Sequence, residues 1–459
     1  WPSGAIVIGL VVVGLLTLGH WEMSAESWGY WFFARIFVET GKFVNPDRAP
    51  IYVLYLGLFR WMGFPISVTV EYVVTGSLVF LAMVAFLRTV VGTWFAILIS
   101  VAWIPFIQTS EPTVQRLALG ASLIGIVFRG NHTNRFGLAL SYASFGVAYL
   151  FRSSYIALLI IFVVYDFIRV VRSGKLNGLM DRNWRGTVLI ASVFVKGSIG
   201  MTLMVILVWF HVAQSLHPWN NGWFTSTRWF PVDNVQSLTD GHFIQAWNWK
   251  YIEYKYGSHE GKDFYFTNHE LFGGASDLLG AVMANPKFVV EDAVRSIKPA
   301  IHSYAKTTEL RLIPTSKWFE VFLPLILLFG AISLSRDTET KVFVIACVVI
   351  TIPSVIVIST PRLYVPVIPV AILGSAWIAL KFKDILNQGS LRIKNVAIGV
   401  GLFGLILSTV YFLARVHFLP QPGYRTLYAV MVCYSIAFLF LLIGYVKVGR
   451  TNPRLVHIA

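Results

Sequence analysis

A small set of acidic and basic side chains lies close to the ends of apolar runs. Glu22, Glu26 and Glu111 are the acidic members of this set. A carboxylate in such a place can take a proton from an attacking group or bind a divalent cation. Arg152 and Arg362 are basic members, and a guanidinium can hold a phosphate through paired hydrogen bonds. These residue types are the ones that proton transfer and phosphate binding require.

Most short motifs that identify enzyme classes are absent from the chain. It contains no glycine-rich phosphate-binding loop, no H-E-x-x-H zinc motif and no nucleophile elbow. Cys347 and Cys433 both lie inside apolar runs, so they offer neither a disulfide framework nor a cysteine-based zinc site. A membrane enzyme without a nucleotide site of its own could still act on a substrate that arrives already activated in the lipid phase.

The composition places the elements that carry these residues in a bilayer. Of the 459 residues, 56% are hydrophobic and 13% are charged, whereas soluble domains carry about 25% charged residues. Apolar runs of about 17–25 residues, the length that crosses about 30 Å of hydrocarbon, are separated by short basic loops. We therefore predict an all-α polytopic membrane protein with about twelve transmembrane helices and an extracytoplasmic loop domain.

The distribution of basic residues gives these helices an orientation. The net charge is +15, and most Lys and Arg residues fall in alternate loops, so the positive-inside rule places the N-terminus in the cytoplasm. The basic charge is thus a topological signal, and we expect no nucleic-acid partner. The predicted spans are residues 4–20, 66–87, 93–108, 114–128, 136–151, 154–168, 187–213, 318–334, 342–359, 365–380, 395–416 and 426–446.

Two outside segments are too long to be simple connections. We divide the chain into an N-terminal transmembrane module, 1–213, a loop domain, 214–317, and C-terminal transmembrane helices, 318–459. The first module contains an outside loop at 21–65, with two aromatic-rich helical patterns suited to lying along the membrane surface. The loop domain is rich in Trp and Tyr, which could stack on sugars, lie in the interfacial belt or dock a partner protein.

The first outside loop resembles a known family. From Glu26 it reads Glu-Ser-Trp-Gly-Tyr-Trp-Phe-Phe-Ala-Arg-Ile-Phe-Val-Glu-Thr-Gly, and Arg48-Ala-Pro-Ile-Tyr follows. This is similar to the loop of GT-C glycosyltransferases that use polyprenyl-phosphate sugars, the group of the protein O-mannosyltransferases and the aminoarabinose transferases. Aligned on the Ala-Arg and Thr-Gly pairs, Glu26 occupies the first of the family's two acidic positions. Ser27 stands at the second.

Other segments agree with this resemblance in their order along the chain. They are Ser110-Glu111-Pro112, Gly146 to Arg152, Asn285-Pro286 with Lys298, and Pro361-Arg362-Leu-Tyr364 with its following prolines. The resemblance implies that Glu26 is the base in an inverting single displacement. It implies that Arg152, Lys298 and Arg362 hold the lipid phosphate and that Tyr364 orients it.

Each candidate also has a structural interpretation. Glu26 can be a carboxylate in a first helical turn, and Glu22 is a second candidate base. Glu111 can form part of a helix N-terminus, contact the acceptor or, with Glu26, bind Mg²⁺, Mn²⁺ or Ca²⁺; nothing in the spacing demands a metal. Arg152 and Arg362 can reach water by snorkelling.

The helical pattern of the first loop separates its charged residues into two faces. In a helix, Glu26 and Tyr30 share one face, whereas Arg35 and Glu39 share the opposite one. We therefore assign Arg35 and Glu39 to structure.

We expect a glycosyltransferase of a prokaryotic cytoplasmic membrane whose site faces outside, in a cavity between the two outside loops. It would move a sugar from a polyprenyl-phosphate donor, entering from the membrane lipids, to a glycan, lipid or protein acceptor. One alternative is a non-catalytic scaffold or accessory subunit with the same fold, and Ser27 in place of a second carboxylate favours it. A third possibility is a secondary transporter. The small number of charges inside the spans argues against it.

Overall fold

The structure, a computed structural model, confirms the all-α class. It describes short pieces between Gly4 and Val11 and residues 25–41, 50–64, 66–108, 113–131, 135–172, 238–257, 264–308, 317–335, 337–357 and 365–388. Nearly all of these residues are helical, and none of them forms a strand.

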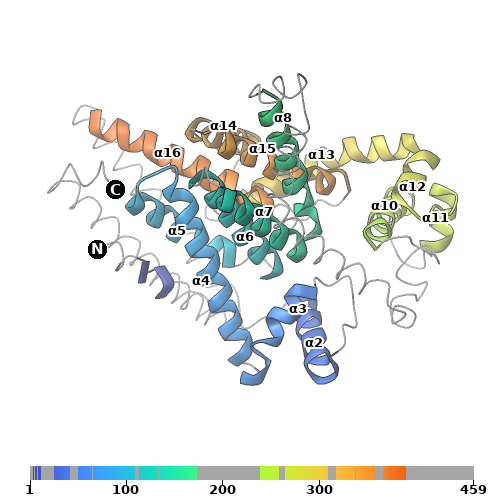
Figure 1. The fold of residues 1–459 in the computed structure, drawn as a ribbon. Helices are drawn as coiled ribbons and strands as arrows, with labels where there is room; N and C mark the ends of the chain where they lie inside the picture. The colour runs from blue at the N-terminus through green and yellow to red at the C-terminus, as the bar shows by residue number, and fades with distance from the viewer. Residues whose placement is uncertain are drawn as a thin grey trace, which may run out of the picture.

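The helices fall into three consecutive groups (Figure 1). The first group is α2 (Ala25–Thr40), α3 (Pro50–Gly57), η1 (Arg60–Met62), α4 (Ile66–Arg88), α5 (Thr93–Gln108), α6 (Thr113–Asn131), α7 (Arg135–Phe151), η2 (Ser153–Tyr155) and α8 (Ile156–Arg172). The second is α10 (Leu238–Tyr256), α11 (Phe264–Phe272), α12 (Leu278–Ala284) and α13 (Pro286–Thr308). The third is α14 (Lys317–Leu334), α15 (Thr338–Val357) and α16 (Ile368–Gln388).

The helices α4 to α8 and α14 to α16 overlap predicted spans, and α2 and α3 overlap the two helical patterns of the first loop. Within the described part of the chain, one helix, α4, is long and apolar enough to cross a membrane by length and composition. Shorter apolar helical stretches occupy 51–62, 137–151, 325–334 and 365–378. The predicted spans at 187–213, 395–416 and 426–446 lie outside the described residues.

Local sequence signals explain where several helices begin and end. Gly41 adopts the left-handed conformation (φ 68°) and its N–H donates to the Phe37 carbonyl at 2.7 Å, which ends α2. Gly63 (φ 73°) makes the turn into α4. The side chain of Asp337 caps α15 by accepting from the Thr340 N–H at 2.6 Å. These turns and caps fix the ends of α2, α4 and α15, three helices that carry charged residues.

The main bundle is built around α6 and α7. Figure 1 shows α4 and α5 on one side of this pair, α8 on the other, and the α14–α16 group across them. Large side chains from five helices fill the core. They are Met83, Leu119, Phe145, Phe162 and Phe343, none of which has measurable exposure.

Close backbone contact joins α14 to α16. A Cβ atom added at Gly374 would lie 2.4 Å from the Leu327 carbonyl oxygen, and one at Gly330 would lie 3.3 Å from the Gly374 Cα. The two helices can therefore approach this closely only because glycine stands at both positions. Small residues at helix crossings are typical of membrane bundles, where packing rather than hydrophobic burial holds helices together.

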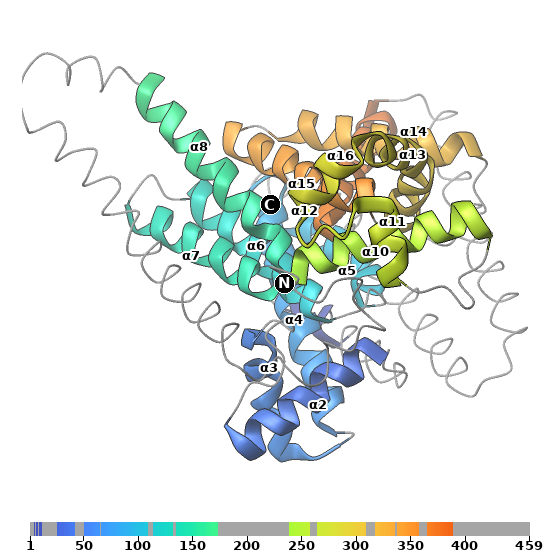
Figure 2. The same ribbon diagram turned by 90° about the vertical axis from the view of Figure 1, so that its right-hand side faces the viewer.

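The described parts of the two segments predicted to be outside loops lie in different places. In Figure 2, α2 and α3 lie at the bottom of the picture, whereas the α10–α13 group lies in front of the upper part of the bundle; Figure 1 shows α10–α12 to one side of it. The helices α10 to α12 enclose a core of their own, made of Ile244, Trp247, Leu271, Phe272 and Ala281. The α10–α12 group thus has a separate core, whereas Tyr30, Tyr52 and Leu56 of α2 and α3 belong to the core of the main bundle.

Candidate functional site

The structure describes only part of the predicted site. Glu22, Glu111, Arg362 and Tyr364 lie outside the described residues, and their predicted roles stay predictions. The backbone of Glu26 lies in the first turn of α2, and that of Lys298 lies in α13. Arg152 is described with its side chain, half-buried at the end of α7. Among these candidates, Arg152 is therefore the one from which a site can be built.

A line of aromatic rings docks the first loop against the end of α7. Tyr30 of α2 makes an edge contact with Tyr52 of α3, with ring centroids 4.8 Å apart. Tyr52 in turn meets Phe151 of α7 at 6.5 Å. Phe151 directly precedes Arg152, and position 26 is one helical turn before Tyr30. The first loop and Arg152 are thus brought together, as a joint site requires.

The opposite face of α2 has a structural pair. Arg35 Nε lies 2.8 Å from Glu39 Oε1, and both side chains are exposed. This confirms the interpretation that these two residues do not face the docked side of the helix.

The described part of the large loop is elsewhere. The helix α13, which carries Lys298, packs against α12, α14, α15 and α16, whereas α2 packs against α3 and η1. Among the described residues, the expected cavity between the two outside loops is therefore not formed by α2 and α13.

Two charged residues that the sequence reasoning missed lie inside the bundle near the first loop. Glu71 of α4 and Arg116 of α6 both have 0% exposure. The guanidinium of Arg116 lies within electrostatic range of the Glu71 carboxylate and over the Tyr72 ring, 5.1 Å from its centroid. Glu71 follows the start of α4 by five residues, about 7–8 Å along the axis at 1.5 Å per residue. We call Glu71, Thr75, Tyr55 and Arg116 the outer cluster.

Hydrogen bonds connect the outer cluster to the first loop. Thr75 Oγ1 donates to Glu71 Oε1 at 2.8 Å, and Tyr55 of α3 lies with its hydroxyl 2.8 Å from Thr75 Oγ1. The second carboxylate oxygen of Glu71, Oε2, is buried and has no hydrogen-bond partner among the described residues. The carboxylate therefore keeps an unused capacity to accept a hydrogen bond.

A signal for the outer cluster was present in the sequence. Glu71 and Arg116 lie inside the predicted spans 66–87 and 114–128, and an ionisable residue inside a span is expensive and usually functional. Neither residue lies at the end of a span, where the predicted site residues lie. Their pairing depends on how α4 and α6 face each other, which the sequence does not show.

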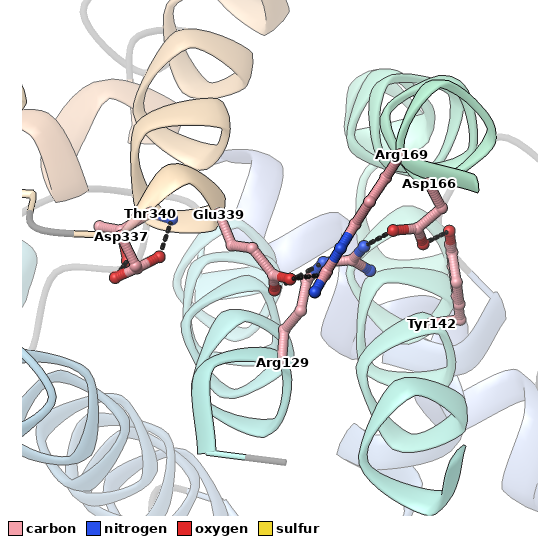
Figure 3. A network of polar contacts seen from close by, with 7 residues as sticks. All are labelled: Arg129, Tyr142, Asp166, Arg169, Asp337, Glu339 and Thr340. Atoms are coloured by element: carbon pink, nitrogen blue, oxygen red, sulfur yellow. Dashed lines mark hydrogen bonds and ion pairs between the residues drawn. The ribbon is translucent and has the colours of Figure 1, made fainter. Parts of the chain in front are cut away.

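A second group of charges, the inner cluster, joins four helices at the other ends of α6 and α8 (Figure 3). Arg129 of α6 donates through Nη2 to Asp166 of α8, and its Nε lies 3.1 Å from Glu339 Oε2 at the start of α15. Arg169 Nη1 donates to Glu339 Oε1 at 2.7 Å, and Tyr142 of α7 donates to Asp166 Oδ2 at 2.5 Å. Two cations therefore face two anions.

Aromatic rings complete the surroundings of Arg129. Its guanidinium carbon lies 4.4 Å from the Phe162 ring centroid, and the rings of Tyr142 and Tyr165 also lie within cation–π range. Burial raises the pKa of Glu339 above its ordinary value, and the charges of Arg129 and Arg169 oppose that rise. The inner cluster thus has the features of a brace between helices that are distant in sequence.

The α10–α13 group contains its own buried carboxylate. Asp292 of α13 has no exposure, and Lys250 Nζ lies 2.9 Å from its Oδ2. Lys250 also donates to Ser296, and the Tyr254 hydroxyl donates to Asp292 Oδ1 at 3.2 Å. These contacts tie α10 to α13 and leave Asp292 fully partnered.

The described residues contain no group of three or more His, Cys, Asp or Glu side chains placed to hold a metal ion. The side chains of Glu26 and Glu111, the candidate oxygen ligands for a divalent cation, lie outside the described residues.

Comparison with known proteins adds no assignment. No family model matches the chain, and no curated protein matches it. The fold and the site define the class of protein: an apolar helical bundle with a buried carboxylate and guanidinium near a docked aromatic loop.

Proposed function

We propose that the chain is an integral-membrane glycosyltransferase similar to the GT-C enzymes, with about twelve transmembrane helices and an outward-facing site. The donor is a polyprenyl-phosphate sugar that enters from the lipid of a prokaryotic cytoplasmic membrane. The acceptor is a glycan, lipid or protein on the extracytoplasmic side. The observation that supports this proposal most directly is the docking of the aromatic first loop onto the end of α7 at Arg152, beside the buried outer cluster.

The chemistry follows from the residue types. Glu26 takes the proton of the acceptor as it attacks the anomeric carbon, and the bond to the lipid phosphate breaks on the opposite face. Arg152 stabilises the charge that develops on the departing phosphate, together with Lys298 and Arg362 in the predicted topology. The configuration of the anomeric carbon is inverted because the reaction is a single displacement.

The test is transfer from radiolabelled polyprenyl-phosphate sugars by the full-length protein reconstituted in lipid. We expect Glu26→Gln to lower turnover by about 100-fold or more, the usual contribution of a general base. Glu39→Gln is the matched control, because it removes a carboxylate from the exposed face of the same helix. Equal turnover of wild type and Glu26→Gln would remove Glu26 from the mechanism, and absence of transfer from every donor would reject the proposal.

One observation favours a second candidate function, secondary transport. Glu71 and Arg116 are buried ionisable groups inside predicted spans, a feature of transport pathways. Uptake of a labelled solute into proteoliposomes, driven by a proton or sodium gradient and lost in Glu71→Gln, would support transport. Sugar transfer with no gradient-driven uptake would support the glycosyltransferase.

A further inference from the structure

The hydrogen bonds of the outer cluster have one consistent direction. A threonine hydroxyl carries a single proton, and Thr75 gives that proton to Glu71 Oε1. The Tyr55 hydroxyl must therefore be the donor to Thr75 Oγ1, over 2.8 Å. The chain of donors runs from the phenol on α3, through the hydroxyl on α4, to the buried carboxylate.

The phenol is well suited to donate in this chain. Burial raises the pKa of the Tyr55 phenol above its ordinary value, and the nearby charge of Glu71 raises it further. Tyr55 thus keeps its proton at neutral pH. Its ring also stacks against Tyr52 at 6.1 Å and meets Phe59 edge-on at 5.1 Å, so the orientation of the phenol is fixed by packing.

The same ring system reaches the candidate site. Tyr52 contacts Tyr30 of α2 and Phe151 of α7, and Phe151 directly precedes Arg152. Any force that holds Tyr55 on the bundle therefore also holds Tyr52 against the end of α7. The hydrogen bonds of the outer cluster supply this force, because they hold Tyr55, whose ring stacks on Tyr52.

A buried carboxylate in this place is costly as a purely structural element. An ion pair inside an apolar core is often no more stabilising than apolar residues of the same size. Glu71 has an Oε2 atom with no hydrogen-bond partner among the described residues, which adds to its cost. An apolar residue at position 71 could not accept the hydrogen bond from Thr75, which in turn contacts Tyr55 of α3.

We propose that Glu71 is a positioning residue that, through Thr75 and Tyr55, holds α3 against the end of α7 so that Arg152 meets the donor phosphate. This inference rests on the proposed function for its effect on catalysis. Its structural part, the anchoring of α3, stands on the hydrogen bonds alone.

The first measurement is amide hydrogen exchange of residues 50–62 in the full-length protein in lipid nanodiscs. We expect Tyr55→Phe and Thr75→Val each to speed exchange of the α3 amides about fivefold, the factor of a single hydrogen bond. Thr75→Ser keeps the hydroxyl and restores the wild-type rate. Unchanged α3 exchange in both Tyr55→Phe and Thr75→Val overturns the inference.

Matched controls separate anchoring from general loosening. Thr351→Val removes a hydroxyl that donates within α15 to the Val348 carbonyl at 2.6 Å, and Tyr142→Phe removes a phenol from the inner cluster. Neither is expected to alter exchange of α3. If Thr351→Val speeds exchange in α3 as much as Thr75→Val does, the anchoring is not specific and the inference is overturned.

The second measurement is steady-state transfer from the donor. We expect Thr75→Val to raise the KM for the polyprenyl-phosphate sugar at least threefold, with Thr75→Ser close to wild type. Transfer by the wild type with an unchanged KM in Thr75→Val overturns the catalytic part of the inference and leaves the proposed function standing. Absence of transfer in the wild type rejects the proposed function, whereas exchange of the α3 amides, measured in Glu71→Leu with Arg116→Met beside Tyr55→Phe and Thr75→Val, still decides whether the outer cluster anchors α3.

Discussion

The inner and outer clusters use the same residue types in different ways. In the inner cluster, Arg129 faces two carboxylates and three aromatic rings, and its anions are shared with Arg169 and Tyr142. In the outer cluster, Glu71 has one hydroxyl donor and a nearby guanidinium, and its Oε2 has no hydrogen-bond partner among the described residues. The first arrangement stabilises a junction of four helices. The second keeps a buried carboxylate with unused capacity beside a candidate site.

The two clusters differ in what their buried charges contact, and this difference separates a structural charge from a functional one. A buried cation that faces two carboxylates stabilises a junction of helices, so its removal costs stability. A buried carboxylate inside a predicted span, whose hydroxyl contacts lead to a neighbouring loop, is retained for what it positions or binds. We therefore expect substitutions in the inner cluster to change stability and substitutions in the outer cluster to change function.

The largest expected effect on stability is that of Arg129→Leu. It leaves Asp166 and Glu339 without their shared cation in a buried junction, so we expect a loss of about 3–5 kcal/mol in the free energy of unfolding. Denaturant titration of the reconstituted protein measures this. Arg88→Leu is the control, because Arg88 is exposed at the end of α4. Equal losses in the two variants would contradict the brace.

The double variant Glu71→Leu with Arg116→Met tests the opposite expectation. Because both buried charges are removed together, we expect stability within about 1–2 kcal/mol of wild type. The KM for the donor should rise at least threefold, as in Thr75→Val, since the hydrogen bonds that hold α3 lose their buried acceptor. The functional role of the outer cluster is contradicted if this variant unfolds as readily as Arg129→Leu or transfers sugar with the wild-type KM for the donor.

The two tyrosines give a smaller and closer contrast. Tyr142 donates to a carboxylate, and hydrogen bonds to charged groups are worth about 1.5–3 kcal/mol, whereas Tyr55 donates to a neutral hydroxyl, which is worth about 1 kcal/mol. We expect Tyr142→Phe to lower stability more than Tyr55→Phe does. Thermal unfolding of both variants checks the order, and a reversed order contradicts it.

The smallest effect is expected from an exposed group outside both clusters. Hydrogen bonds from Lys255 and then Tyr251 lower the pKa of Glu270 below its ordinary value of 4.5. A lowered folded-state pKa stabilises the protein above the ordinary value, and this contribution is lost as pH falls through the folded-state pKa. We expect the stability difference between wild type and Glu270→Gln to be small, to be fully present above the ordinary pKa, and to fade as pH falls through the lowered folded-state pKa. A difference that grows on acidification would contradict this sign.

Much of the helix content could be predicted from the sequence because it depends on local signals. The apolar runs predicted α4 to α8, and the two aromatic-rich helical patterns of the first loop, near Glu26–Thr40 and Pro50–Trp61, predicted α2 and α3. Arg35 and Glu39 could be set aside for a similar reason, since helix geometry alone puts them on one face.

The site was harder to predict. Arg152 was found because its place at the end of a predicted span stood out against the charge bias of the loops. Glu71 and Arg116 belong to different predicted spans, with a third span between them, and neither residue lies in a motif. Their relation becomes visible only when α4 and α6 are packed side by side.

The sequence by itself determined the all-α class, the positions of many helices and the chemical types available at their ends. Those properties follow from hydrophobic pattern and local hydrogen bonding, which act over one or two helical turns. The tertiary structure alone decided which charges meet: Glu339 reaches Arg129 and Arg169, and Tyr55 reaches the buried carboxylate of α4. The reason is that side-chain contacts between helices depend on their rotation and crossing, which the whole packed core sets.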